Sequence, residues 1–320
     1  MTSPLTVIPP GERAVRRPHG DGAQRMGFFT DTTVCIGCKA CEVACKQWND
    51  LPADGSVFRR GGSYDHTGSL GANTWRHVRF VELLEPAETG YLPQIPATSG
   101  DLDLVGAAEG AADMSRWVFM SDVCKHCSHA GCLDACPTGA LIRTEFDTVV
   151  LQPDVCNGCG YCVSACPFGV VARDHDDGRA AKCTLCYDRL QDGLEPACAK
   201  SCPTDSIQFG PYDELVARAR GRVRALHERG MIDAYLYGAG DEPEDRLAGG
   251  LGAFFLLREP PERYGLPARA DSPVQENVPQ ATAAGLGAAA AALVGVAMTL
   301  VGAHRAARRS QPRRRLSRRA

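Results

Sequence analysis

The chain has 320 residues and 16 cysteines, and the spacing of these cysteines is its clearest chemical signal. They form four runs, and each run opens with two thiols that are separated by two residues. The runs are Cys35, Cys38, Cys41 and Cys45; Cys124, Cys127, Cys132 and Cys136; Cys156, Cys159, Cys162 and Cys166; and Cys183, Cys186, Cys198 and Cys202. Sixteen thiolates in this arrangement predict four [4Fe–4S] cubane clusters with four cysteine ligands each.

Two other uses of paired thiols fit this chain less well. A disulfide framework is typical of short secreted chains, whereas 320 residues are enough for a hydrophobic core. A structural zinc ion usually draws its tetrahedral ligands from two separated C-x2-C pairs and does not need a third thiol so close by. No histidine replaces a cysteine in any run, so the spacing does not indicate Rieske-type clusters.

The last cysteine of each run follows the previous one by four residues, about one helical turn. In that position it faces the second cluster of a pair. Pro137, Pro167 and Pro203 follow it in three of the runs and stop the helical turn. Residues 136–142 and 202–210 then predict a turn and a short strand. This repeat predicts an α+β fold with two 2x[4Fe–4S] ferredoxin-like modules, in which a line of clusters suits electron transfer better than catalysis.

The segments between and after the runs predict the elements that position them. Residues 74–83 and 115–123 are rich in aromatic and β-branched residues and predict strands inserted between the first two runs. The small and acidic residues of 97–114 predict a surface loop. Apolar periodicity predicts a helix over 211–230, and a strand is expected over 252–259 after a glycine turn at 249–252.

The C-terminal region predicts a membrane anchor. Residues 281–303 carry no charge and would form a helix of about 34 Å at about 1.5 Å per residue. That length spans a bilayer core of about 30 Å, and the alternative is a buried, alanine-rich soluble helix. Eight arginines and no acidic residue follow in 304–320, whereas the whole chain has a net charge of −3. The expected organisation is a flexible arm (1–25), a cluster domain (26–210, with an insertion at 46–123), a helix and strand extension (211–280), the transmembrane helix (281–303) and a basic tail (304–320).

The charge distribution also predicts a topology. Arginine-rich segments next to a transmembrane helix remain on the cytoplasmic side, so the cluster domain is expected on the outer face of the membrane. No apolar segment follows Arg16 and Arg17, which argues against a twin-arginine export signal in this chain. We therefore expect folded export together with a partner that carries the signal.

The anchor also predicts a contact with a membrane partner. Gly287, Ala291 and Gly295 recur every fourth residue and form a stripe of small side chains that lets another helix approach closely. Elsewhere, His126 and His129 lie within the second run, where the complete cysteine count makes packing or surface roles more natural than ligation. No phosphate-binding or dinucleotide-binding motif and no nucleophile constellation is present, so no catalytic site is expected in the chain itself.

Several motifs resemble the iron–sulfur β subunit of respiratory, membrane-bound formate dehydrogenase. They are TTVCIGCKACEVACKQWND (32–50), CKHCSHAGCLDACPTGAL (124–141), CNGCGYCVSACPFGV (156–170), KCTLCYDRLQDGLEPACAKSCPTDSIQFG (182–210) and PERYGLP (261–267). The four-run layout alone is similar to a wider family, with subunits of dimethyl sulfoxide reductase, nitrate reductase and hydrogenase. The longer stretch between the first two runs and the arginine-rich tail depart from the pattern of the formate dehydrogenase subunits.

The resemblance implies how the runs pair and what the chain does. It implies that the first run pairs with the fourth and the second with the third. The implied ligand sets are Cys35, Cys38, Cys41 and Cys202 (set 1); Cys45, Cys183, Cys186 and Cys198 (set 2); Cys124, Cys127, Cys132 and Cys166 (set 3); and Cys136, Cys156, Cys159 and Cys162 (set 4). Electrons would come from formate at a molybdenum or tungsten pterin site on an α subunit and pass to haem b and quinone in a membrane γ subunit.

Two rival interpretations remain open. The equivalent subunit of a membrane hydrogenase, or of another molybdopterin oxidoreductase, would share the cysteine layout and can also carry an anchor. A zinc-dependent nucleic-acid module is the rival from a different class, but the acidic body of the chain argues against it. Brown protein with broad visible absorption would distinguish iron–sulfur clusters from zinc.

Overall fold

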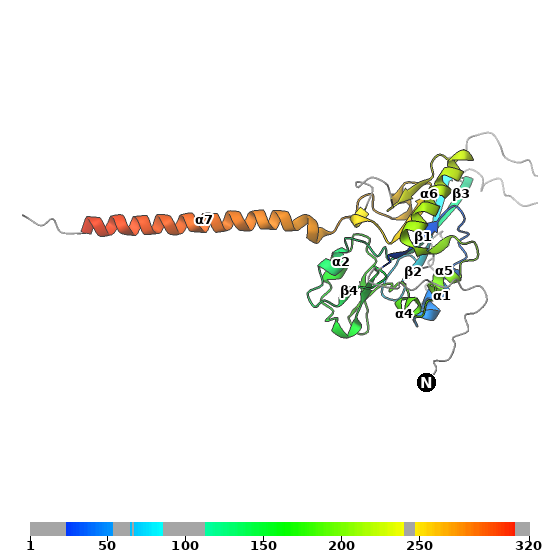
Figure 1. Ribbon diagram of the computed structural model, residues 1–320, viewed down its shortest axis with the longest axis horizontal. Coiled ribbons are helices and arrows are strands. Elements are labelled where there is room, and N and C mark those ends of the chain that lie inside the picture. Colours follow the sequence, from blue (N-terminus) through cyan, green and yellow to red (C-terminus); the bar gives the residue numbers. More distant parts are fainter. Residues whose placement is uncertain (1–23, 54–64, 66, 86–112, 240–246, 311–320) are drawn as a thin grey trace, which may run out of the picture. The chain divides into compact units, whose positions relative to one another are not determined.

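The computed structural model describes residues 24–53, 65, 67–85, 113–239 and 247–310. The chain divides into two units, Met1–Ser272 and Pro273–Ala320, which are described separately (Figure 1). Sequence expectations for the arm at 1–25, the loop at 97–114 and the basic tail fall largely outside the described residues.

A mixed four-stranded sheet forms the centre of the first unit, with the strand order β8-β1-β10-β9. Its strands are β1 (Met26–Asp31), β8 (Ile207–Pro211), β10 (Ala253–Leu257) and β9 (Tyr235–Tyr237). β1 runs antiparallel to β8 and parallel to β10, and every residue of β1 and β10 is buried. Such continuous burial is typical of central strands that are covered on both faces. Helix α6 (Tyr212–Glu228) contacts β1, and the rings of Phe29 and Phe254 stack 5.4 Å apart within the core.

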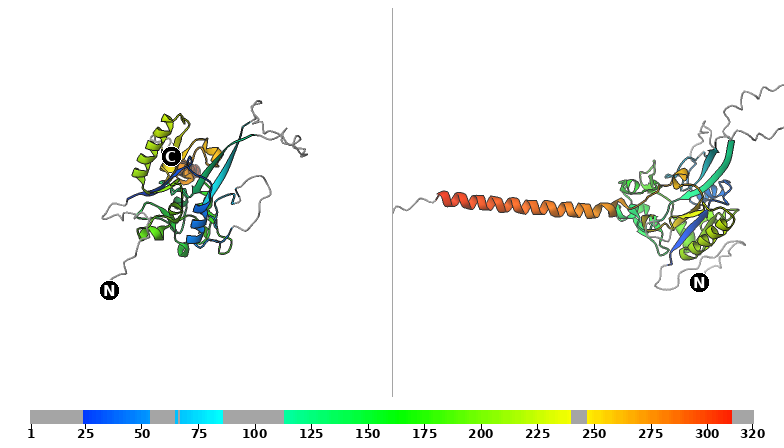
Figure 2. Two further views of the ribbon diagram at one scale, coloured as in Figure 1. Left: turned by 90° about the vertical axis from the view of Figure 1, so that its right-hand side faces the viewer. Right: turned by 90° about the horizontal axis from the view of Figure 1, so that it is seen from above.

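A long antiparallel pair of strands, β2 (Arg76–Glu85) and β3 (Asp113–Val123), follows the first cysteine run and precedes the second in the sequence. Figure 2 shows the pair as two long strands side by side. The pairing begins with Arg76 opposite Val123, the residue immediately before Cys124. Both strands confirm the sequence predictions over 74–83 and 115–123. Edge-to-face contacts among Phe80, Trp117 and Phe119 line one side of the pair.

Short elements surround the cysteines. The helices are α1 (Ala40–Trp48), α2 (Gly131–Asp134), α3 (Tyr161–Ser164), α4 (Tyr187–Gln191) and α5 (Ala197–Lys200), with 3-10 turns at Pro153–Val155, Leu247–Gly249 and Pro261–Tyr264. Two small hairpins pair β4 (Leu141–Arg143) with β5 (Val149–Leu151) and β6 (Ala172–Arg173) with β7 (Ala180–Ala181). Helix α1 contacts α5, whereas α2 contacts α3. The helix of the first run therefore packs against that of the fourth, and the second against the third.

Most elements after the last run agree with the sequence predictions. Helix α6 lies within 211–230, β10 lies within 252–259, and Gly249 and Gly250 have φ values of 74° and 110° in the expected turn. The pattern did not predict β9, nor the insertion of β1 between β8 and β10. Because β10 pairs with β1 from the other end of the domain, the segment after α6 is part of the central sheet.

The second unit contains one long helix, α7 (Pro273–Ser310). The candidate membrane span within it, Pro273–Ala306, contains an 18-residue window with a mean hydropathy of 2.0 and is the one helix among the described residues that is long and apolar enough to cross a membrane. None of its most apolar window is buried, which argues against the alternative of a buried soluble helix. The helix starts at Pro273, before the predicted start at Ala281, because proline suits a first helical position and Glu276 favours the positive end of the helix dipole.

The close approach of β1 to the segment before β10 generates the first prediction. A Cβ atom on Gly27 would overlap the backbone oxygen of Gly252, which accepts a hydrogen bond from the Phe28 N–H at 2.8 Å. Gly27→Ala should lower the free energy of unfolding by about 1–3 kcal/mol, since overpacking here displaces backbone rather than a side chain. The matched control is Gly71→Ala, whose Cβ meets nothing within 4 Å. Equal thermal midpoints for both anaerobic variants would contradict this account of the sheet.

Candidate metal centres

One backbone feature recurs in the opening C-x2-C loop of all four runs. The residue immediately before the second cysteine has a left-handed conformation in each loop, with φ values of 67° at Gly37, 43° at His126, 72° at Gly158 and 60° at Leu185. Left-handed residues in tight turns bring successive N–H groups to one side, a concave arrangement that holds anions and many iron–sulfur centres. In the fourth run, the Leu185 N–H donates to Cys183 Sγ at 3.2 Å. The cysteine spacing did not predict this conformation at His126 or Leu185, because neither is a glycine.

A second repeated turn follows the Cys-Pro pairs. The third residue after the cysteine is again left-handed, with φ values of 70° at Gly139, 62° at Gly169 and 52° at Asp205. Around Cys136, burial would raise the pKa of the thiol, but N–H donors from Leu141, Thr138 and Ala140 act in the opposite direction and leave the pKa below its usual value. The turn therefore favours the thiolate form that a metal needs.

Strand pairing brings the distant first and fourth runs together. Thr30 lies opposite Ile207 in the β1–β8 ladder, and the Asp31 N–H donates to the Ser206 carbonyl oxygen at 2.8 Å. Cys35 follows β1 and Cys202 precedes β8, so both lie at the same end of the ladder. Antiparallel pairing thus makes neighbours of residues from opposite ends of the domain.

The β4–β5 hairpin brings the second and third runs together. Leu141 lies opposite Leu151, and the Gln152 N–H donates to the Ala140 carbonyl oxygen at 2.8 Å. Because Cys136 precedes β4 and Cys156 follows β5, the hairpin holds these two cysteines at one end. In both pairs of runs, an antiparallel ladder therefore brings two distant cysteines to the same end.

The electrostatic influence of the thiols on one another outlines four groups, without linking Cys41 to Cys35 or Cys38. For one cysteine in each group, burial raises the pKa and other thiols add to the rise: Cys202 and Cys38 for Cys35; Cys183, Cys198 and Cys186 for Cys45; Cys124, Cys166 and Cys132 for Cys127; and Cys136, Cys156 and Cys159 for Cys162. Cys41, in α1, lies beside Cys198 of α5. The first run thus meets the fourth, and the second meets the third.

Two cavities are lined by complete groups of four cysteines. One is lined by Cys45, Cys183, Cys186 and Cys198, and the other by Cys124, Cys127, Cys132 and Cys166. Much of the remaining lining is apolar and includes Phe28, Trp75 and Leu185 in the first cavity and Phe168 and Val171 in the second. Within the described part of the chain, no three His, Cys, Asp or Glu side chains converge closely enough to hold one metal ion. Four cysteine thiols around one cavity are the ligand set that a [4Fe–4S] cubane takes.

The groups follow one another in a fixed order. Across their boundaries, Cys198 raises the pKa of Cys41, Cys124 raises that of Cys183, and Cys162 raises that of Cys132, in each case after the larger effect of burial. Cys38 and Cys159, in the first and last groups, are exposed, whereas the groups between them contain no exposed cysteine. Neighbouring groups thus influence each other in succession, and the two exposed cysteines belong to the first and last of them.

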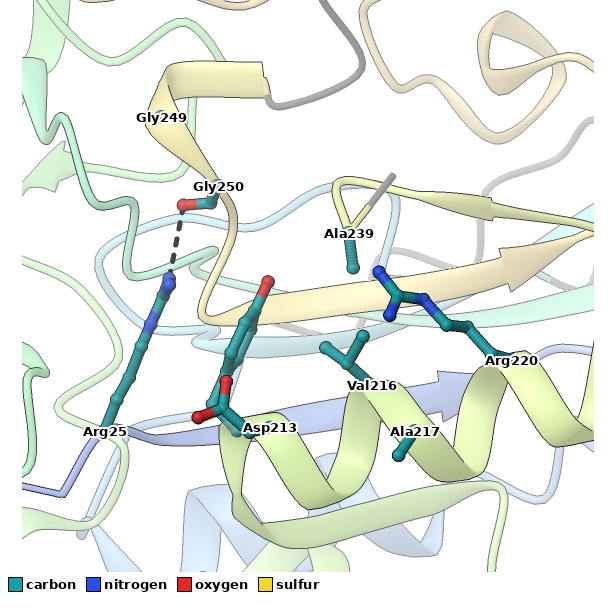
Figure 3. A pocket seen from close by; sticks show the side chains of 9 residues that line it. Arg25, Asp213, Val216, Ala217, Arg220, Ala239, Gly249 and Gly250 are labelled. Atoms are coloured by element: carbon teal, nitrogen blue, oxygen red, sulfur yellow. Dashed lines mark hydrogen bonds between the residues drawn. The ribbon is translucent and has the colours of Figure 1, made fainter. Parts of the chain in front are cut away.

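The remaining candidate features do not join these groups. His126 is buried, and its Nδ1 accepts a hydrogen bond from the Val149 N–H at 3.1 Å, in agreement with the packing role expected from the sequence. An open pocket lies along α6, where Arg25 donates to the Gly250 carbonyl oxygen at 3.3 Å and stacks 3.9 Å from the centre of the Tyr212 ring (Figure 3). Among the described residues that line this pocket, none is a cysteine or a histidine.

Comparison with known proteins agrees with these centres. Residues 34–140 and residues 115–212 each match a family described as a 4Fe-4S dicluster domain. The formate dehydrogenase iron-sulfur subunit of Haemophilus influenzae is 38% identical over 251 residues, which cover 77% of this chain and 70% of that protein. The formate dehydrogenase-O iron-sulfur subunit of Escherichia coli is 38% identical over 218 residues, 68% of this chain and 63% of that protein.

A relative from a different reductase matches a shorter region. One subunit of the anaerobic dimethyl sulfoxide reductase of Escherichia coli is 35% identical over 196 residues, which cover 60% of this chain and 76% of that protein. The formate dehydrogenase subunits therefore match more of the sequence. With two dicluster, ferredoxin-like domains and these relatives, the chain belongs to the family of formate dehydrogenase iron–sulfur subunits.

Proposed function

We propose that this chain carries electrons from a formate-oxidising α subunit, with a molybdenum or tungsten pterin, to a membrane cytochrome b and quinone γ subunit. The single observation that carries the proposal is the linear order of four cysteine groups with one exposed cysteine at each end. A carrier between two proteins needs an accessible point of entry, an accessible exit and a protected path between them. When bound, each cubane supplies a site that takes up and releases one electron.

The proposed ligands are the four sets that the family resemblance implied. Cluster 1 takes Cys35, Cys38, Cys41 and Cys202; cluster 2 takes Cys45, Cys183, Cys186 and Cys198; cluster 3 takes Cys124, Cys127, Cys132 and Cys166; and cluster 4 takes Cys136, Cys156, Cys159 and Cys162. The two cysteine-lined cavities support sets 2 and 3, and the shared ladder ends support sets 1 and 4. In this arrangement each ferredoxin-like module draws its ligands from two separate runs.

Formate rather than dimethyl sulfoxide is favoured by the extent of the matches. The formate dehydrogenase subunit of Haemophilus influenzae matches 77% of this chain, against 60% for the dimethyl sulfoxide reductase subunit. The equivalent subunit of a hydrogenase, or of another molybdopterin oxidoreductase, is the second candidate.

The anchor completes the proposed assembly. Helix α7 would span the membrane once, with the arginines of 304–320 on the cytoplasmic side and the clusters on the outer face. Export of the folded chain with its α partner would then follow, because the clusters must be loaded in the reducing cytoplasm. Gly287, Ala291 and Gly295 are exposed on α7 and form the proposed contact with the γ subunit.

The crossed ligand sets generate a prediction for Cys202. Cys202→Ser should perturb the paramagnetic signal of the cluster held by Cys35, Cys38 and Cys41, because the ladder between β1 and β8 places it beside the first run. Cys136→Ser is the matched control, since Cys136 also precedes a proline but belongs to set 4. Electron paramagnetic resonance of the reduced complexes measures both variants. If Cys202→Ser changed only the cluster of Cys183 and Cys186, the crossed sets would be wrong.

The small-residue stripe generates a prediction for electron transfer to quinone. Gly295→Ile should block close approach of a partner helix, so formate oxidation with a soluble dye persists while formate-driven quinone reduction falls at least several-fold. Ala297→Ile introduces the same side chain about 200° around the helix and should have little effect.

These two activities also test the proposed function itself. Wild-type complex that oxidises formate without reducing quinone would contradict the proposed function. Equal quinone reduction by Gly295→Ile and wild type would contradict only the proposed contact of the small-residue stripe with the γ subunit.

A further inference from the structure

A buried arginine lies between two of the cysteine sets. Arg76 opens β2 and has only 1% of its surface exposed. Its Nη2 donates to Cys198 Sγ at 3.1 Å, and its Nη1 lies 3.3 Å from both the carbonyl oxygen and Oγ of Ser121. The guanidinium also stacks over the Phe28 ring, 4.7 Å from its centre. Arg76 therefore reaches set 2 directly.

The same arginine reaches set 1 through one hydroxyl group. Ser121 Oγ lies 3.2 Å from Cys41 Sγ and 3.3 Å from Arg76 Nη1. Cys41 belongs to set 1 and Cys198 to set 2, so a continuous chain of contacts runs from Cys198 through Arg76 and Ser121 to Cys41. The β2–β3 ladder fixes the backbone of Arg76 opposite Val123, and the contacts with Ser121 and Phe28 hold its guanidinium.

The charge of Arg76 is compensated by cysteines rather than by carboxylates. Among the described residues, no carboxylate forms an ion pair with it. Its guanidinium instead contacts the Cys198 thiol directly and the Cys41 thiol through Ser121 Oγ. An isolated buried charge is strongly unfavourable, so anionic sulfur is what makes this position tolerable.

Lys125 shows the contrasting arrangement. It is as deeply buried as Arg76 and also lines a cysteine-ringed cavity. Its Nζ, however, forms an ion pair with Asp122 and donates to the Val123 carbonyl oxygen at 2.9 Å. The charge of Lys125 is therefore neutralised locally, whereas that of Arg76 remains directed at the cysteines.

We propose that Arg76 is a positioning residue shared by clusters 1 and 2, whose fixed positive charge raises the reduction potentials of both. A cubane held by four thiolates gains negative charge on reduction, so a nearby cation stabilises the reduced form. The effect is larger for cluster 2, which receives the direct hydrogen bond, than for cluster 1, which is reached through Ser121. Shared between the two, the charge also reduces their mutual repulsion when both are reduced. This inference rests on the proposed function and on its ligand sets.

The test is a redox titration of the whole complex, followed by electron paramagnetic resonance, for wild type and Arg76→Gln. Two of the four midpoint potentials should fall. At a fixed ambient potential the ratio of reduced to oxidised cluster 2 should drop at least tenfold, about 59 mV for a one-electron couple. Cluster 1 should shift less, and Arg76→Lys should restore most of both shifts.

Two further variants distinguish the effect of Arg76 on clusters 1 and 2 from a general effect of removing a positive charge. Ser121→Ala should lower the midpoint of cluster 1 alone, because it removes the contact with Cys41 and leaves Arg76 beside Cys198. Arg258→Gln removes the same unit charge from a side chain that is 26% exposed and paired with Asp233, and should move no midpoint.

Each outcome decides the proposal. Four unchanged midpoints in Arg76→Gln with full iron content, or equal shifts of all four, would overturn it. If Arg76→Gln loses a cluster, the Ser121→Ala variant provides the test instead. An unchanged midpoint potential of cluster 1 in Ser121→Ala would then overturn the proposal. Wild-type complex whose β subunit holds far fewer than about 16 iron atoms would instead refute the four-cluster function.

Discussion

The pairing of β1 with β8 is the contact on which the arrangement of the cysteines depends. It joins segments that are far apart in the sequence and brings the end of β1, before Cys35, next to the start of β8, after Cys202. Closing so long a loop costs entropy, but this cost grows only slowly with loop length. Burial of Phe28, Phe29 and Phe254 in the same sheet stabilises the paired strands and so offsets this entropy cost. The central sheet therefore makes it possible for the first and fourth runs to meet.

The cysteine groups also bear on the stability of the short elements around them. Helices α2, α3 and α5 have four residues each, and β6 and β7 have two, which is too short to be stable alone. Burial raises the pKa of Cys41 and Cys183 to about 12, so without metal these thiols stay protonated at neutral pH. Loading a cluster displaces those protons, and the binding energy then contributes to folding. Arg76 is part of the same balance, because its buried charge depends on anionic sulfur nearby.

Much of the fold and of the metal centres could be predicted from the sequence, because the patterns that indicate them lie within short segments. Thiol spacing predicted clusters, β-branched runs predicted β2 and β3, and periodicity predicted α6. The parallel pairing of β1 with β10 could not be predicted, since nothing in either segment identifies its neighbour. Nor did the alternation in β2 distinguish Arg76, which is buried among cysteines, from Arg79. The left-handed conformation of His126 and Leu185 follows from the shape of the loop rather than from residue type. The dicluster family matches span runs adjacent in sequence, whereas the contacts join the first run to the fourth.

The central claim is that each cubane is held by cysteines from two runs, in a line with accessible ends. The most direct measurement is an anomalous difference map of the anaerobic complex, collected at the iron absorption edge. We expect four compact iron peaks in a row, with Cys202 bonded to the peak that Cys35 and Cys38 hold and Cys166 bonded to the peak that Cys124 holds. A peak enclosed by Cys35, Cys38, Cys41 and Cys45 alone would contradict it.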